Sequence, residues 1–354
     1  MYNPGVDTLT QIALGATVAE AGFRHRLGGK AVLLGAACGL APDLDMLSRL
    51  GGEFASMVHH RGITHSLLAL AVVSPLVGYA GYRWSGKRDR WLVWTHLAFW
   101  ALVTHPLLDL FTTYGTQLFT PLTDHRYALD AVSVVDLVCS LPLWIVGLWS
   151  LIRARREALL RRRWLAAGAL VWTFGYLLVG WGLSQTVVKH AQKQLRADGF
   201  TPVEVRATPT MLVTGTWRVV ARNDRGDLRV GLASSWAGER VDFRRFDRPR
   251  DALVNKALAS PRGRMMQWFT GNMFRARVDR TKQGGRVVLA DARFGLLSDV
   301  SKTVFRLQFD FDSAGRLRRV RRLSRGMDFS LGQELGVWWR VLTTGHSGQP
   351  GREP

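Results

Sequence analysis

The chain of 354 residues is poor in cysteine, and its first residues are not typical of a leader segment. Its two cysteines, Cys38 and Cys139, both lie in apolar stretches. This pattern argues against a disulfide framework and against a cysteine-based zinc site. Residues 1–11 show no basic region ahead of the first apolar residues, so we do not expect a cleaved signal peptide.

Acidic residues are also scarce, because 27 Asp+Glu stand against 48 Lys+Arg and the formal net charge is +21. This surplus indicates anionic partners such as membrane lipid, nucleic acid or phosphorylated substrates. Residues 1–188 hold 16 basic and 11 acidic side chains, whereas residues 189–354 hold 32 and 16. No nucleic-acid motif accompanies the charge, so we do not expect a nucleic-acid partner.

Four apolar segments have the length of membrane-spanning helices, which need about 17–25 residues. Tryptophan and tyrosine gather near several of their ends, as in interfacial belts. Two earlier apolar runs, residues 8–23 and 31–41, are shorter and fit a re-entrant or bundle-packed position. The rival interpretation is a soluble bundle of buried helices. The four segments are residues 66–82, 91–111, 131–152 and 164–188.

The loops between these segments carry an orientation signal. Basic residues concentrate in residues 24–30, 83–90 and 153–163. If the segments alternate in direction, all three loops lie on one side, which the positive-inside rule identifies as cytoplasmic. The histidine and aspartate clusters described next then lie toward the opposite side.

Residues 60–65 bring several functional side chains together. His60 and His65 enclose Arg61, and the stretch leads directly into an apolar segment. Downstream, His105 and Asp109 are four positions apart and share one helix face. Imidazole is the commonest metal ligand in proteins, and ionisable groups beside membrane-length apolar segments are functional by default. The sequence therefore predicts a metal site at the membrane surface.

Aspartates complete the predicted site. Asp43 and Asp45 follow Pro42 at the end of an apolar run, and at least one of them is expected to be a ligand or a general base. Arg61 is expected to clamp a phosphate or face a developing negative charge. The alternatives are a capped turn after Pro42 for Asp43 and Asp45, and the N-cap of the first helix for Asp7. Arg61 could instead anchor lipid headgroups, and His105 and Asp109 could form a hydrogen bond within their helix. Asp136 lies inside an apolar run and needs a partner, so we expect it behind the metal ligands rather than among them. The predicted metal ligands are His60, His65, His105, Asp109, Asp43 and Asp7.

The second half of the chain changes character. Short strands are expected at residues 203–205, 217–221, 228–233, 241–246, 286–290 and 304–311, with a helix at 251–269 broken near Pro261. We therefore predict a mostly α multi-span membrane domain at 1–188, a soluble basic α+β domain at 189–344 on the periplasmic side, and a loose tail at 345–354.

These motifs together resemble those of the YdjM-like inner-membrane proteins over roughly residues 6–185. The matching elements include Asp7 to Thr10 and His105 to Asp109 followed by Thr112-Thr113-Tyr114-Gly115. The family is described as membrane-bound metal-dependent hydrolases and has been grouped with zinc-dependent phospholipase C-like helical folds. The resemblance therefore implies a bacterial inner-membrane location and phosphoester hydrolysis. One departure is Gln11, where many relatives have histidine.

The leading hypothesis is a metal-dependent hydrolase that uses metal-activated water on a lipid or lipid-linked phosphoester. Zinc is the expected ion, with manganese or iron as alternatives. The second hypothesis is a non-catalytic membrane protein in which the clusters form a structural metal or hydrogen-bond network. A transporter is a third, but the clusters face one side without a matching set on the other.

Overall fold

The computed structural model describes residues 4–51, 54–87, 89–152, 159–210, 213–238, 240–281, 284–323 and 330–348. The chain forms two compact units, Met1–Trp181 with Met211–Val213, and Gly182–Thr210 with Thr214–Pro354. The division falls within one long helix, α8 (Leu159–Ala197), as does the predicted domain boundary at residue 188. Arg88, most of the basic loop at 153–163 and the end of the tail lie outside the described residues.

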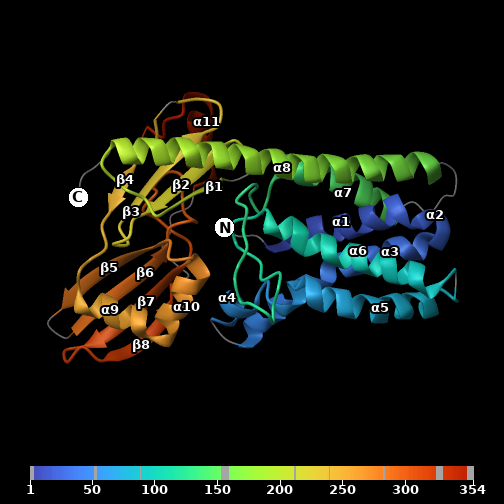
Figure 1. Cartoon of the computed structure of the whole chain (residues 1–354), viewed down its shortest axis with the longest axis horizontal. Coiled ribbons are helices and arrows are strands. Elements are labelled where there is room, and N and C mark those ends of the chain that lie inside the picture. Colours follow the sequence, from blue (N-terminus) through green and yellow to red (C-terminus); the bar gives the residue numbers. More distant parts are fainter. Residues whose placement is uncertain are drawn as a thin grey trace. The chain divides into compact units, whose positions relative to one another are not determined.

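Unit 1 is helical (Figure 1). Among the described residues, three helices are long and apolar enough to cross a membrane: α5 (Leu67–Trp84), α6 (Trp91–Leu110) and α8 from Leu160 onward. Helix α7 (Leu137–Ile152) is apolar but shorter. The remaining helical elements are α1 (Pro4–Gly22), α2 (Arg24–Leu27), α3 (Gly29–Leu40), η1 (Ala41–Gly51), α4 (Ala55–His59) and η2 (Ile63–His65).

The segment predicted as a span at residues 131–152 begins later than expected, because α7 starts only at Leu137. Asp136 precedes it, and its Oδ1 accepts a hydrogen bond from the backbone nitrogen of Cys139 at 3.0 Å. Its Oδ2 accepts a second bond from the hydroxyl of Tyr176 at 3.1 Å. Asp136, which we expected behind the metal ligands, is thus found capping the N-terminus of α7.

Helices α1 and α3 meet at a contact made of glycines. A Cβ placed on Gly35 would overlap the carbonyl oxygen of Gly15 and the Cβ of Ala19. A Cβ on Gly39 would overlap the carbonyl oxygen of Gln11. Small residues let helix backbones approach closely, which is how apolar helices associate inside membranes. The close approach brings the last turn of α3 beside Gln11 of α1.

Residues from the three basic segments meet at one end of unit 1. Arg26 donates two hydrogen bonds to Asp89, at 2.9 and 3.1 Å. Lys30 donates to the carbonyl oxygen of Trp84 at 2.9 Å, and Arg163 donates to the last turn of α1 at 3.1 Å. These contacts lie at the α2 end of the helices, whereas α4 lies at the opposite end (Figure 1). The described parts of the basic segments therefore share one end of unit 1.

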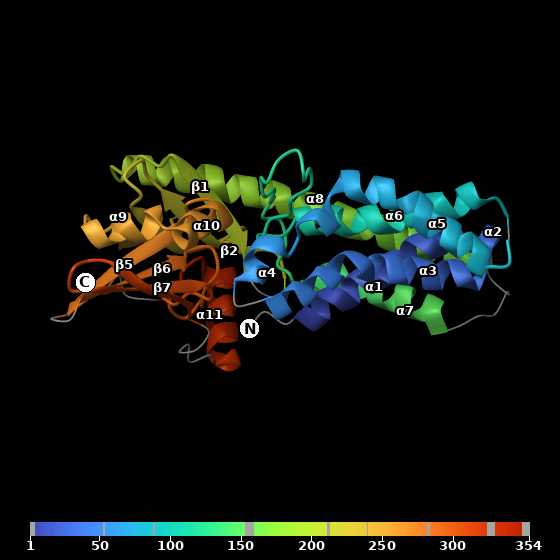
Figure 2. The same ribbon diagram turned by 90° about the horizontal axis from the view of Figure 1, so that it is seen from below.

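Unit 2 contains two four-stranded antiparallel sheets, ordered β1-β2-β3-β4 and β5-β6-β7-β8. Helices α9 and α10 lie beside the second sheet (Figure 2), and α11 packs against β2 and β3 of the first. The strands are β1 (Glu204–Pro209), β2 (Thr216–Arg222), β3 (Leu228–Ser234), β4 (Arg244–Phe246), β5 (Phe274–Thr281), β6 (Gly284–Asp291), β7 (Arg306–Asp312) and β8 (Leu317–Arg322). The helices are α9 (Ala252–Ala259), α10 (Pro261–Thr270) and α11 (Leu331–Thr344).

The six predicted strands and the helix break at Pro261 are all found, with shifts of a few residues at their ends. The prediction missed β5, β8 and α11. Strand β5 carries an alternating signal, since Phe274, Ala276 and Val278 are separated by polar residues. Strand β8, with the sequence LRRVRR, has no such alternation and none of its residues is buried.

We expect Gly35→Ala to destabilise unit 1, because the new methyl group collides with backbone atoms of α1 that cannot move aside. Overpacking of this kind costs on the order of 1–3 kcal/mol. The matched control is Gly168→Ala in α8, where an added Cβ meets nothing within 4 Å. Thermal unfolding of the detergent-solubilised protein should show a lower midpoint for Gly35→Ala alone. Equal midpoints for the two variants would contradict the α1–α3 contact.

Candidate metal centre

Helix α6 carries His105 and Asp109 one turn apart, and each is only 1% exposed. The Nδ1 of His105 lies 2.7 Å from the carbonyl oxygen of Gly39, at the end of α3. A carbonyl oxygen only accepts hydrogen bonds, so Nδ1 carries the proton and Nε2 presents its lone pair. Backbone hydrogen bonds of this kind commonly orient metal-binding imidazoles.

His65, at the end of η2, meets His105 directly. Its Nε2 lies 3.1 Å from the Nε2 of His105, and its side chain is completely buried. The other ring nitrogen of His65, Nδ1, lies 3.0 Å from the hydroxyl of Thr64 and 3.3 Å from Oδ2 of Asp45. A carboxylate behind the imidazole fixes its orientation and makes Nε2 more basic. Two lone-pair nitrogens at this separation favour a cation between them.

Two carboxylates face the same point. Oδ1 of Asp43 lies 3.5 Å from the Nε2 of His105 and 3.8 Å from that of His65. Oδ2 of Asp109 lies 3.3 Å from the Nε2 of His65 and 3.6 Å from that of His105. Asp43, His65 and His105 each offer a ligand atom, and these atoms lie within 4.8 Å of one another.

The donor set fits a small divalent ion. Ligand atoms around a tetrahedral zinc lie about 2.0–2.2 Å from the ion, and therefore roughly 3.3–3.5 Å from one another. The distances between the imidazole nitrogens and the carboxylate oxygens fall around this range. Oδ2 of Asp109 is also buried and accepts no hydrogen bond from the described residues. Such an oxygen is costly without a partner, and a cation at this point would satisfy it.

Asp45 stands behind the two histidines of the 60–65 stretch. Its Oδ1 lies 2.7 Å from Nδ1 of His60. Its Oδ2 accepts from the backbone nitrogen of Arg61 at 2.9 Å and from the hydroxyl of Thr64 at 2.8 Å. The structure therefore separates the two aspartates that the sequence left as alternatives: Asp43 faces the cluster and Asp45 supports it from behind.

The protonation of these supporting groups follows from burial and hydrogen bonding. Burial opposes charge on Asp45, but hydrogen bonds with His60 and His65 outweigh it and hold the pKa of Asp45 below its usual range. Burial is the main cause that lowers the pKa of His60. Burial also acts to lower the pKa of His65, but the surrounding carboxylates of Asp109, Asp43 and Asp45 raise it to about 9. The carboxylates thus favour positive charge at the centre of the cluster.

His60 lies beside the cluster, with its ring centroid 6.0 Å from that of His65. Asp45 occupies its Nδ1, so Nε2 is the nitrogen with a lone pair. This Nε2 is buried and has no hydrogen-bond partner among the described residues. His60 is not part of the compact group formed by Asp43, His65 and His105.

Arg61 and Asp7 form the far wall of the site. The Nη2 of Arg61 lies 3.0 Å from Oδ1 of Asp109 and 3.3 Å from Oδ2 of Asp7. Its Nη1 donates to the hydroxyl of Thr112 at 2.6 Å. The residue has a positive φ of 61°, an uncommon conformation for a side chain other than glycine. Arg61 therefore contacts Oδ1 of Asp109, the oxygen that does not face the histidines.

Sequence comparison agrees with this arrangement of motifs. The profile of the YdjM inner membrane protein family matches residues 6–187, which is more than half of the chain. The chain belongs to this family. The resemblance predicted from the motifs is thereby confirmed, and so is the assignment to a membrane protein with apolar helices.

Two curated relatives match parts of the YdjM region. Uncharacterized protein YfhP of Bacillus subtilis (strain 168) is 31% identical over 116 residues, covering 30% of this chain and 34% of that protein. Inner membrane protein YbcI of Escherichia coli (strain K12) is 37% identical over 93 residues, covering 25% of this chain and 51% of that protein. The chain thus spans between a third and about half of these relatives. No solved structure matches it.

Gln11 is the position that the motif resemblance marked as a departure. Its Nε2 donates to Oδ1 of Asp109 at 3.0 Å and lies 3.4 Å from the carbonyl oxygen of His105. The amide therefore contacts the outer oxygen of Asp109, beside Arg61, and leaves Oδ2 facing the histidines. The sequence marked this position as a departure from the motif, but its supporting role became visible only from the structure.

We expect Arg61→Met to destabilise unit 1 strongly, because it leaves the buried carboxylates of Asp7 and Asp109 without their common counter-charge. Removing one partner of a buried ion pair costs about 3–5 kcal/mol. Arg26→Met is the control, since Arg26 is half exposed and its pair with Asp89 is worth little. Thermal unfolding of metal-free protein should separate the two variants clearly. A similar small shift for both would argue against the Arg61 network.

Proposed function

We propose that the chain is a membrane-bound metal-dependent hydrolase with one divalent ion held by Asp43, His65 and His105, and with Asp109 as an additional ligand. The observation that carries the proposal is the pair of buried Nε2 atoms 3.1 Å apart, each flanked by a carboxylate oxygen. Imidazole and carboxylate ligands together suit zinc first, and also manganese or iron. A bound ion of this kind supplies Lewis acidity and lowers the pKa of water toward neutrality.

His60 is the residue we propose as proton acceptor. Asp45 holds its Nδ1 at 2.7 Å, so the unpartnered Nε2 carries the lone pair. This pairing of a carboxylate with an imidazole is the usual way to fix the tautomer of a general base. The sequence had assigned His60 as a ligand and Asp45 as a ligand or base. The geometry favours exchanged roles: Asp45 orients the imidazole of His60, and His60 accepts the proton.

Arg61 and Gln11 act as positioning residues in this proposal. Both contact Oδ1 of Asp109, at 3.0 Å in each case, and so fix the carboxylate with Oδ2 toward the histidines. Arg61 was expected to face the developing charge on a substrate. Its guanidinium instead contacts two buried carboxylates, which supports a role in holding Asp109 rather than in contacting substrate.

The position of the site favours a lipid or lipid-linked phosphoester as substrate. Asp109 lies roughly 27 Å further along α6 than Trp91, about the thickness of a bilayer core. The basic segments gather at the Trp91 end, so the positive-inside rule places the site toward the periplasmic face. Within unit 1, Tyr176 of α8 bonds to Asp136 at the start of α7, so α8 leaves the bundle at the site end. We propose a multi-pass chain with a periplasmic C-terminal unit, and membrane lipid as its partner.

A non-catalytic role is the second candidate, and one observation favours it. Asp7, Arg61, Asp109 and Thr112 form a buried network of ion pairs and a hydrogen bond between side chains. In that case the cluster would only hold the helices of unit 1 together and would not catalyse a reaction. Metal content and metal-dependent turnover separate the two candidates.

We expect about one zinc or manganese per chain in the purified protein, and loss of that metal in His65→Ala and His105→Ala. The reason is that each variant removes one of the two central nitrogen donors. His96→Ala is the matched control, because His96 is exposed on the same helix α6. Elemental analysis of detergent-purified protein makes the comparison. Absence of metal from the wild type after reconstitution with zinc, manganese and iron would overturn the proposal.

His60→Gln should keep the metal but lose turnover. General bases contribute about 10²–10⁴-fold to rate, so the loss should fall in that range. The assay follows phosphate or headgroup release from a panel of phospholipids and lipid-linked phosphates, with and without chelator. Loss of metal in His60→Gln would instead make His60 a ligand, as the sequence suggested. Turnover that is unchanged in His60→Gln and resistant to chelator would rule out His60 both as the general base and as a metal ligand.

A further inference from the structure

Unit 2 contains a cavity of about 840 Å³ that the metal centre does not use. It is bounded by the end of α8, the first residues after that helix, strands β3 and β4, and the segment 240–243 that leads into β4. This volume is in the range of small-molecule sites, about 300–1,000 Å³. The charged side chains that line it are Arg229, Arg240, Arg244, Arg245, Asp198 and Asp242.

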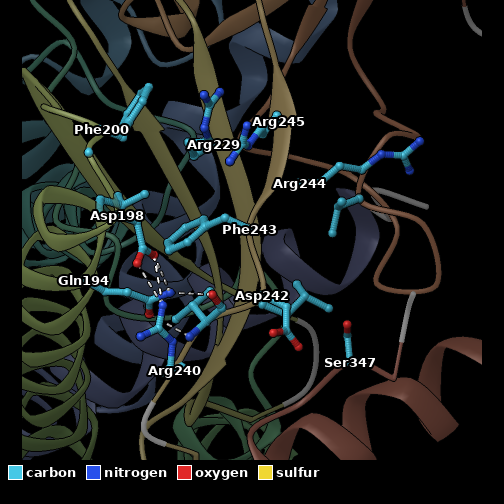
Figure 3. A pocket seen from close by; sticks show the side chains of 15 residues that line it. Gln194, Asp198, Phe200, Arg229, Arg240, Asp242, Phe243, Arg244, Arg245 and Ser347 are labelled. Atoms are coloured by element: carbon cyan, nitrogen blue, oxygen red, sulfur yellow. Dashed lines mark hydrogen bonds and ion pairs between the residues drawn. The ribbon is translucent and has the colours of Figure 1, made fainter. Parts of the chain in front are cut away.

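Two of the arginines are forced together by the register of the sheet. Arg229 of β3 stands directly opposite Arg245 of the edge strand β4. Residues paired in this way project to the same face, and like charges in this arrangement destabilise the sheet. Figure 3 shows the two side chains next to each other in the cavity, whereas Arg244 extends away from them.

The available carboxylates compensate this pair only in part. Arg229 reaches Asp247 at 3.1 Å, but the side chain of Asp247 is 72% exposed, so the pair is weak. The guanidinium of Arg229 also stacks over the ring of Phe200, at 4.6 Å. Arg245 is exposed and forms no ion pair with any residue that the structure describes. An anion that bridges both guanidinium groups would relieve their repulsion.

The residues on the opposite wall of the cavity are held in place by hydrogen bonds and ion pairs with one another. Arg240 pairs with both oxygens of Asp198, at 2.9 and 3.1 Å, and Gln194 exchanges two bonds of 2.8 Å with the backbone of Val241. Asp242 lies 3.4 Å from His346. These contacts fix the segment before β4 against the end of α8 and give each acidic side chain on this wall a basic neighbour of its own. The anionic group of a ligand therefore belongs at the Arg229 and Arg245 side.

We propose that this cavity binds a phosphate ester, with the phosphate between Arg229 and Arg245 and the organic group toward Phe243. Guanidinium groups form paired hydrogen bonds with phosphate oxygens, and two of them offer more donors than one carboxylate can accept. Phe243 projects into the cavity between Phe200 and Gln194 (Figure 3). The cavity is larger than inorganic phosphate requires, so it leaves room for an attached group. A soluble phosphate ester and a phospholipid headgroup share this chemistry.

The test uses the full chain in a neutral detergent, treated with EDTA so that a metal in unit 1 does not bind phosphate. Calorimetric titration with glycerol 3-phosphate should show saturable binding near one per chain. Arg245→Gln and Arg229→Gln should each weaken it by at least about tenfold, as expected for lost charge-assisted hydrogen bonds. The control is Arg319→Gln, an equally charged change at an exposed residue of β8 that does not line the cavity.

A second titration, with a short-chain phosphatidylglycerol below its micelle concentration, identifies the source of the phosphate. Tighter binding of the lipid with the same arginine dependence assigns a membrane headgroup, and equal or weaker binding assigns a soluble ester. No saturable binding of either probe overturns the proposal. So does equal weakening by Arg245→Gln and Arg319→Gln, since the effect would then be one of net charge. Arg245 is exposed, so this variant is expected to fold even if Arg229→Gln does not.

Discussion

The contact between the Nε2 atoms of His65 and His105 is the constraint on which unit 1 depends. Each imidazole is held from behind, one by the carbonyl oxygen of Gly39 and the other by Asp45, so both lone pairs point at the same spot. Two lone pairs 3.1 Å apart in a buried site repel each other unless a proton or a metal ion lies between them. The oxygens of Asp43 and Asp109 add negative charge at the same place. Removing one of these four side chains would therefore change the charge balance around the other three.

The helix packing of unit 1 serves this contact. Glycine at positions 35 and 39 allows α3 to approach α1 at backbone distance. That approach presents the carbonyl oxygen of Gly39 to His105 and brings Gln11 to Asp109. A larger residue at these glycines would act on the metal centre through the backbone, without touching a ligand. Packing and chemistry are coupled here because the supporting hydrogen bonds come from the crossing helices themselves.

Much of this arrangement could be predicted from the sequence, and the reasons are local. The spacing of His105 and Asp109 predicts that they share one helix face, and the lengths of the apolar segments predict the helices. The spacing of Asp43 and Asp45 could not show which one faces the site, because that depends on the turns of η1. The same holds for His60 and His65, which lie on either side of a backbone reversal at Arg61. Gln11 seemed a poor ligand by type, and its role as a donor to Asp109 required the fold. In unit 2, strand β8 escaped prediction because its arginines are exposed or half-buried and its sequence shows no alternation of apolar and polar residues.

The uneven charge of the chain has two separate explanations. In unit 1 most of the basic residues sit in short segments at helix ends, which is where charge determines membrane orientation. In unit 2 they are spread over folded strands, and many pair with aspartates, as Arg280 does with Asp251 and Arg318 with Asp312. A folded domain crosses a membrane largely regardless of such charge, so the basic character of unit 2 does not oppose a periplasmic position. Where pairing fails, as between Arg229 and Arg245, the remaining positive charge is concentrated in a cavity rather than diluted over the surface. Charge held in a concave site is screened less by salt than charge on an open face, so it selects a ligand rather than merely attracting anions.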